Sequence, residues 1–309
     1  IVKGKKWMIP FFLNRKQRRH LFVDDRFGIY PQSSENIIIK DPIYILYHPW
    51  HVNFHHFVVD TLTQLPKYFE YKKKYPNMKL LTTKLLHPAF TSWLFDLGVE
   101  KKDLMKVLHR RESKTFSSPL IASSKSSYKE LRKLFMVKLK KMSENVISPK
   151  IFIGRKDDEN YSDCFDPLKN EEYYLAKYDG KRVCINGKKM HNLVRDRGFT
   201  VVYMEDYSLK ERFNILQNAE IIISPIGANC TNLLLSNDSC KIMIISQQIS
   251  GKWAKSILRM LSGTLPKTTV YASMEHKTLT PSLTLSSNWE CDLDLLEKDL
   301  TFCLSDKVV

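Results

Sequence analysis

The chain has 309 residues, of which 43% are apolar and 27% charged, proportions that exclude a disordered or collagen-like protein. No stretch approaches the roughly 20 apolar residues of a membrane span. The net charge of +16 lies in one half, because residues 1–150 hold 29 basic and 12 acidic side chains whereas residues 151–309 hold 20 and 21. Such an excess attracts a nucleic acid, an anionic lipid or an acidic glycan, or belongs to a lysine-rich solvated surface.

Hydrophobic periodicity predicts strands alternating with helices. In the first half we expect strands at 43–47, 79–82, 107–108 and 120–122, and helices at 54–71, 88–97 and 128–142. In the second half we expect strands at 151–153, 200–204, 220–224 and 241–246, and helices at 188–197, 209–218, 229–235, 252–261 and 292–303. Gly98 and Gly198 mark helix ends, and Ser208 with Glu211 forms a capping box.

The alternation predicts an α/β protein with two domains, residues 1–148 and 149–309. The boundary follows a serine-rich stretch and a basic amphipathic helix. In the second domain, apolar strands separated by helices predict a doubly wound parallel sheet covered on both faces. The last helix could pack back on the first domain.

One strand–helix turn in the second domain suits a phosphate group. After a buried strand, Gly227 lets the backbone approach a ligand, and a helix that begins near Asn229 offers N–H groups and about half a unit of positive charge. Thr231 and Asn232 add side-chain donors. GxGxxG and GxxxxGK[ST] are both missing, which disfavours a dinucleotide site and a P-loop. A plain turn capped by Thr231 or Asn229 is the structural alternative.

A histidine cluster in the first domain is the strongest candidate for catalysis. Four of the nine histidines fall within nine residues, at His48, His51, His55 and His56. On a helix His56 and Asp60 are i and i+4 and share a face, and a carboxylate beside an imidazole is typical of a general base. Zinc bound by His51, His55 and His56 is less favoured, because adjacent helical residues point about 100° apart and no HExxH motif is present. The alternative to a catalytic role is a structural one, in which the cluster caps and packs the start of the helix.

Arg155 and Lys156 follow a predicted strand, at the end where anionic ligands bind. The guanidinium of Arg155 suits bidentate contact with a phosphate. A surface ion pair with Asp157 or Asp158 is an equal alternative.

Two other patterns favour structure over metal chemistry. Asp292 and Asp294 have DxD spacing, but they open a predicted helix, where acidic residues favour the dipole. The six cysteines form no CxxC pair and read as reduced thiols: Cys164, Cys184, Cys230, Cys240, Cys291 and Cys303. With no apolar leader segment in a chain that begins at Ile1, we expect a fragment or processed form in the cytoplasm, with the inner face of a membrane as one place of peripheral contact.

Taken in order, several segments resemble glycosyltransferase family 61, inverting enzymes that include xylan and arabinoxylan transferases and a protein O-mannose N-acetylglucosaminyltransferase. Residues 53–65 resemble N-Y-Y-H-W-L-L-E-x-L-P-R-L, residues 153–156 resemble I-S-R-R, and residues 219–232 resemble A-E-I-I-V-G-P-H-G-A-G-L-T-N. Residues 116–124 resemble the strand before the family's second half. The resemblance covers roughly residues 40–270. The chain departs from the family at Phe57, Thr63, Gln64 and Ile226, which stand for Trp, Pro, Arg and His.

The resemblance implies a GT-B fold, two Rossmann-like domains with parallel sheets that face each other across a cleft. It implies an inverting transfer from a nucleotide-sugar, most simply a UDP-sugar, to a glycan acceptor, with His56 and Asp60 as catalytic residues and Asn53 and His55 on the acceptor side. The donor would be bound by Arg155, Lys156, Gly227, Ala228, Asn229, Thr231 and Asn232. No metal or cofactor is expected. The basic half suggests an anionic, capsule-type polysaccharide acceptor or contact with an anionic membrane. The rival functions are a non-catalytic nucleic-acid or acidic-polymer-binding protein and a histidine-rich metal hydrolase.

Overall fold

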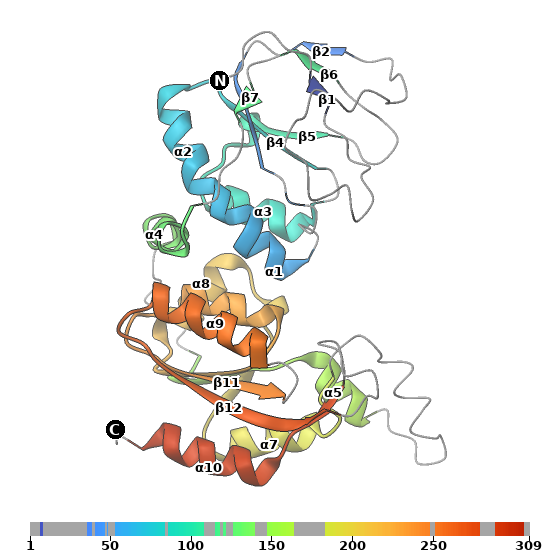
Figure 1. Cartoon of the computed structure of the whole chain (residues 1–309), viewed down its shortest axis with the longest axis vertical. Coiled ribbons are helices and arrows are strands. Elements are labelled where there is room, and N and C mark those ends of the chain that lie inside the picture. Colours follow the sequence, from blue (N-terminus) through green and yellow to red (C-terminus); the bar gives the residue numbers. More distant parts are fainter. Residues whose placement is uncertain are drawn as a thin grey trace. The chain divides into compact units, whose positions relative to one another are not determined.

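The computed structural model describes residues 7–8, 36–38, 41–46, 48, 53–83, 86–107, 115–117, 120–121, 126–139, 147–163, 183–247, 251–278 and 288–305. The chain forms two compact units, residues 1–138 and 139–309, and each is described by itself (Figure 1). Both are mixed α/β structures built on parallel sheets, which confirms the predicted fold class at that level. The GT-B arrangement and the division at residue 148 stay predictions.

The strands of the first unit are β1 (Trp7–Met8), β2 (Asn36–Ile38), β3 (Ile43–Ile45), β4 (Lys79–Thr83), β5 (Leu104–Val107), β6 (Thr115–Ser117) and β7 (Leu120–Ile121). Its helical segments are α1 (Phe54–His56), the π-helical turn η2 (Phe57–Thr61), the 3-10 turn η3 (Leu62–Gln64), α2 (Leu65–Lys74), α3 (Pro88–Asp96), the 3-10 turn η4 (Lys101–Asp103) and α4 (Tyr128–Lys138). Every strand and helix predicted for the first half overlaps one of these elements. The strand expected at 107–108 is β5 and begins earlier, at Leu104, and residues 140–142 of the last expected helix lie outside the described residues.

The prediction of one regular helix over residues 54–71 is wrong in detail, since α, π and 3-10 turns precede α2. Pro66 lies in the first turn of α2. Proline has no N–H to donate to a preceding carbonyl, so a regular helix cannot run through it. The β-branched Val58 and Val59 also lower the helix propensity of this stretch.

The main sheet of the first unit has the strand order β5-β4-β3-β7, and all neighbours are parallel. The chain places β4 and β5 on one side of β3 and then returns to place β7 on the other. The carboxyl end between β3 and β7 is therefore a topological switch point, the place where open parallel sheets bind ligands. A second sheet of order β1-β6-β2 completes the described strands of this unit.

The strands of the second unit are β8 (Lys150–Ile153), β9 (Thr200–Val202), β10 (Ile221–Pro225), β11 (Lys241–Gln247), β12 (Thr269–Thr278) and β13 (Trp289–Glu290). Its helical segments are α5 (Lys156–Asp163), α7 (Gly187–Asp196), the 3-10 turn η5 (Met204–Asp206), α8 (Leu209–Asn218), the 3-10 helix η6 (Ala228–Leu235), α9 (Gly251–Thr264) and α10 (Leu293–Leu304). One prediction needs correction, since the strand from residue 200 ends at Val202. The helix predicted after the turn at Gly227, called the glycine turn below, is present as the 3-10 helix η6.

The sheet of the second unit has the order β13-β12-β11-β10-β8-β9, parallel except at β13. In chain order, the parallel strands read 2-1-3-4-5, a doubly wound arrangement with its switch point between β8 and β10. Figure 1 shows α7 and α10 on one face of the sheet and α8 and α9 on the other. The core between the sheet and α7 and α10 includes Phe152, Met190, Ile223, Leu296 and Leu300.

Local signals predicted from the sequence are confirmed at three helix ends. Gly98 and Gly198 follow α3 and α7 with φ of +96° and +81°, the left-handed conformation that glycine adopts without strain. Ser208 and Glu211 form the predicted capping box at the start of α8.

The described cysteines are buried thiols outside any disulfide: Cys184, Cys230, Cys240, Cys291 and Cys303. Cys164 lies outside the described residues. Among the helices that the structure describes, none has the length and apolar character needed to cross a membrane.

Candidate active site

The histidine cluster lies just beyond the carboxyl end of β3, next to the switch point of the first sheet. His48 follows β3 by three residues, and α1 begins at Phe54. Asn53 is the N-cap of α1, where its Oδ1 accepts hydrogen bonds from the backbone N–H groups of His55 (2.9 Å) and His56 (3.4 Å). The capping role considered for this cluster is therefore real for Asn53. His51 lies outside the described residues.

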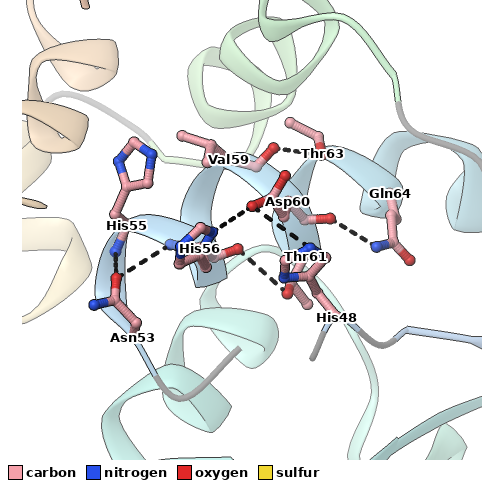
Figure 2. A network of polar contacts seen from close by, with 9 residues as sticks. All are labelled: His48, Asn53, His55, His56, Val59, Asp60, Thr61, Thr63 and Gln64. Atoms are coloured by element: carbon pink, nitrogen blue, oxygen red, sulfur yellow. Dashed lines mark hydrogen bonds and ion pairs between the residues drawn. The ribbon is translucent and has the colours of Figure 1, made fainter. Parts of the chain in front are cut away.

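The π turn η2 displaces the helical hydrogen bonds around Asp60. The N–H of Leu62 bonds the carbonyl of Phe57, five residues earlier. Buried side chains then bond carbonyls of the turn, as Figure 2 shows: Thr63 Oγ1 donates to Val59 O at 2.9 Å, and Gln64 Nε2 donates to Asp60 O at 2.6 Å. Single π turns inside helices occur often at functional sites. Here the turn fixes the backbone that bears Asp60.

His56 and Asp60 form the predicted i, i+4 pair. Nδ1 of His56 lies 2.6 Å from Oδ2 of Asp60, and the side chains keep 34% and 16% of their surface exposed. A carboxylate in this position accepts the Nδ1 proton, which leaves Nε2 as the ring nitrogen that can accept a proton from a ligand. The pair has the geometry of a general base and is accessible to solvent.

Two more histidines surround this pair. The ring of His48 stacks on that of His56, with centroids 5.4 Å apart, and His48 Nε2 lies 3.8 Å from Asp60 Oδ2. The ring of His55 meets that of His56 edge-on at 5.4 Å. His48, His56 and Asp60 bring three potential metal-ligand atoms within 4.8 Å of one another. This trio differs from the histidines considered from the sequence.

The donor-binding candidates of the second unit come together at its switch point. Arg155 follows the end of β8 and Gly227 follows the end of β10, and these two strands are parallel neighbours. Gly227 is buried, whereas Ala228, Asn229 and Arg155 are partly exposed. The sheet therefore joins two motifs that are about 70 residues apart in the sequence. This is the position at which doubly wound domains bind nucleotides.

Thr231 and Asn232 support the turn itself. Both are buried, and they donate to carbonyls of their own helix: Thr231 Oγ1 to Ala228 O at 2.6 Å and Asn232 Nδ2 to Asn229 O at 3.0 Å. Direct donor contact by these side chains stays a prediction. Gly227 has an extended backbone, with φ of 165°, a conformation that any residue adopts, so backbone strain does not require glycine there.

The acidic neighbours of Arg155 and Lys156 differ from the ion pair considered from the sequence. Lys156 is exposed, and its Nζ lies 2.5 Å from Oδ1 of Asp206, so the ion pair considered for it exists but with another partner. Asp158 is fully buried and accepts a hydrogen bond from the N–H of Cys184 at 2.9 Å. Burial raises the pKa of Asp158 to about 7, although the positive charge of Arg155 acts in the opposite direction.

Arg212 is a residue that the sequence analysis missed. It lies in the first helical turn of α8, where Nη1 donates to Asn232 Oδ1 at 3.3 Å and Nε to Tyr207 O at 2.9 Å. Burial lowers the pKa of its guanidinium to about 10. It thus brings a partly desolvated positive charge to Asn232, in the 3-10 helix that follows Gly227. One signal in the sequence could have identified it. A cation near a helix N-terminus is unfavourable for the helix dipole, so an arginine in the first turn of a predicted helix indicates a role outside that helix.

The DxD pattern has the structural role expected of it. Asp292 is the N-cap of α10, and its Oδ1 accepts from the N–H of Leu295 at 2.9 Å. Asp294 lies in the first turn of the same helix.

Comparison with known proteins agrees with the resemblance of the motifs. The family model described as Glycosyltransferase 61 matches residues 54–243, more than half of the chain, and the match contains the His56–Asp60 pair, Arg155 and the glycine turn. A search of curated proteins gives no match. Family membership supports glycosyltransferase activity, with donor and acceptor sugars as its substrates. The chain belongs to glycosyltransferase family 61.

Proposed function

We propose that this protein is an inverting glycosyltransferase that moves a sugar from a nucleotide-sugar to a glycan acceptor. The observation that carries the proposal is the 2.6 Å contact between His56 Nδ1 and Asp60 Oδ2 at the switch point of the first sheet. Nε2 of His56 would take the proton of an acceptor hydroxyl as that oxygen bonds to the anomeric carbon. The bond from the anomeric carbon to the diphosphate breaks at the same time, and a single displacement inverts the configuration.

In this scheme Asp60 holds the imidazole in one tautomer and stabilises the imidazolium that forms. His56 is therefore the base and Asp60 the residue that orients it. Asn53 fixes the helix start, and His55 would contact the acceptor.

The leaving nucleoside diphosphate would bind at the switch point of the second sheet. Arg155 and the backbone N–H groups of Ala228 and Asn229 would offset its charge, with Lys156 nearby. Arg212 would add positive potential behind the turn. Fixed positive groups make a metal ion unnecessary in this scheme, and UDP-sugars are the donors we expect first.

The acceptor is inferred from charge alone. Residues 1–150 have 29 basic and 12 acidic side chains, and an anionic glycan of the capsule type would be attracted to such a surface. The same charge supports peripheral contact with an anionic membrane in the cytoplasm.

A donor screen by thermal shift tests the proposal most directly. The full chain would be heated with UDP-, GDP-, CMP- and dTDP-sugars, each with and without EDTA. A ligand at 100 times its Kd stabilises by about 2.7 kcal/mol, a shift of a few degrees. One nucleotide class that stabilises equally with EDTA would support a metal-independent donor site. No shift with any nucleotide would instead favour a polyanion-binding protein, whose affinity for RNA or DNA would depend steeply on salt.

Variants then separate the two sites. His56→Gln and Asp60→Asn should keep the donor shift and lose turnover. Glu70→Gln is the matched control, because it makes the same carboxylate-to-amide change on α2 at a side chain that is 64% exposed. The anomeric configuration of the product by NMR tests inversion, and a retained configuration would contradict the single displacement.

A further inference from the structure

We propose that His48, His56 and Asp60 form a binding site for a first-row transition-metal ion of the Zn²⁺ type, and that the bound ion blocks the base. The metal site rests on geometry alone, whereas the block of transfer rests on the function proposed above. The first observation is that these residues place one ligand atom each within 4.8 Å of the others.

The distances suit a metal with a small adjustment. Zinc binds imidazole nitrogen at 2.0–2.1 Å and carboxylate oxygen at 2.0–2.2 Å, so ligand atoms on a tetrahedral ion lie about 3.3 Å apart. The two measured separations from Asp60 Oδ2 lie on either side of this value: 2.6 Å to His56 Nδ1 and 3.8 Å to His48 Nε2. An ion would open the first contact and close the second by less than 1 Å each. The third separation, between the ligand nitrogens of His48 and His56, is at most 4.8 Å, so it would close by up to about 1.5 Å.

The supporting contacts keep the ligands near this geometry. His56 and Asp60 share one helix face, the spacing with which helices present two metal ligands. Asn53 anchors the helix start, and Gln64 holds the carbonyl of Asp60 (Figure 2). Residues that orient metal ligands in this way commonly raise metal affinity. His48 comes from a separate segment, after β3, and closes the site from the other side.

The ligand chemistry selects the class of ion. Two imidazoles and one carboxylate suit zinc and its neighbours in the first transition row. Mg²⁺ and Ca²⁺ prefer oxygen ligands and should not bind here. The three side chains keep 16–34% of their surface exposed, which lets a hydrated ion enter, and water would complete its coordination.

Metal binding and base catalysis exclude each other at this site. The ion displaces the proton that His56 Nδ1 shares with Asp60 to solvent, and Nε2 takes up a proton from solvent, so the ring stays neutral and only its tautomer changes. A neutral imidazole that binds metal through Nδ1 carries its remaining proton on Nε2. That nitrogen can then no longer accept the proton of an acceptor hydroxyl, so the ion inhibits transfer.

The test measures binding without donor or acceptor. The full chain is stripped with EDTA, freed of chelator, and titrated with Zn²⁺ by calorimetry and with Co²⁺ by visible absorption. We expect one ion per chain and no binding of Mg²⁺. His48→Phe keeps an aromatic ring against His56 but removes a ligand, and His48→Gln is a second variant in case the first fails to fold. Each should weaken Zn²⁺ binding at least tenfold.

His87→Asn is the matched control. His87 is an exposed histidine whose Nδ1 caps α3 by accepting from the N–H of Ala89, and asparagine can replace that acceptor. This variant should bind Zn²⁺ as the unaltered protein does. Equal affinity of the His48 variants and the unaltered protein would overturn the site.

Once a donor and an acceptor are known, the ratio of transfer rates with and without Zn²⁺ tests the second step. This ratio should be about one tenth or less for the unaltered protein and close to one for His48→Phe. Activation by Zn²⁺ would overturn the inhibitory role. Binding that depends on His48 in a protein without transferase activity would reject the proposed function and leave the metal site standing.

Discussion

Gln64 offers a test of whether the irregular helix positions the carboxylate of Asp60. Its Nε2 donates to Asp60 O across 2.6 Å, and the side chain is only 4% exposed. Methionine has a similar length and no donor, so Gln64→Met leaves this carbonyl without that partner. Loss of one partner of a buried hydrogen bond costs about 1–3 kcal/mol. We expect a loss of stability in this range together with a fall in kcat.

Thr63→Val is the matched control for this change. Thr63 Oγ1 donates to Val59 O across 2.9 Å, and the side chain is 1% exposed. Valine has the same shape, so this variant also removes one buried donor from the same turn. The carbonyl that loses its partner belongs to Val59 and not to Asp60. The Thr63→Val protein should therefore lose a similar amount of stability while the carboxylate of Asp60 stays in place.

Urea denaturation followed by tryptophan fluorescence gives the stabilities, and initial rates give kcat and the KM for the donor. A base displaced by about 1 Å can cost about 100-fold in rate. We expect Gln64→Met to lower kcat by about 10- to 100-fold, to leave the donor KM unchanged, and to exceed the effect of Thr63→Val at least fivefold. Equal kcat values in two variants of equal stability would refute the positioning role.

Three other predictions follow from the two units. His56→Gln and Asp60→Asn should each lower turnover by about 10²- to 10⁴-fold, and the double variant should be no slower than the slower single one, because the pair acts as a unit; multiplied losses would contradict this. Asp158 has a folded pKa of about 7 against an ordinary value of 3.8, so the stability that it contributes is complete below pH 3.8 and lost as the pH rises through 7. Compared with Asp158→Asn, the unaltered protein should lose about 1.4 kcal/mol of unfolding free energy per pH unit between pH 5 and 6.5. Urea denaturation at several pH values measures this loss, and the same pH dependence of stability in both proteins would exclude a raised pKa of Asp158. Gly187→Ala would place Cβ 2.6 Å from Asp158 Cβ and 2.8 Å from its backbone oxygen, so thermal and urea denaturation should show a loss of about 1–3 kcal/mol; Gly263→Ala in α9 meets nothing within 4 Å and should instead stabilise by about 0.4–1 kcal/mol.

Local features of this protein could be predicted from the sequence because they depend on neighbouring residues. Periodicity located the strands and helices, and Gly98 and Gly198 located two helix ends. The i, i+4 spacing alone predicted that His56 and Asp60 would meet. The irregular turn between them was missed, although Pro66 was visible, because apolar periodicity outweighed the missing N–H of proline in the prediction.

Strand order and the partners of charged groups were decided by tertiary structure. The pairing of β8 with β10 brings Arg155 and Gly227 to one switch point, and Lys156 meets Asp206 from 50 residues away. His48 and Arg212 gained their places beside Asp60 and Asn232 in the same way. Periodicity records which face of an element is buried, but not which element covers it, because that choice is made by contacts between segments far apart in the chain. The sequence therefore indicated candidate residues in each unit, and the folding of the sheets decided which side chains surround them.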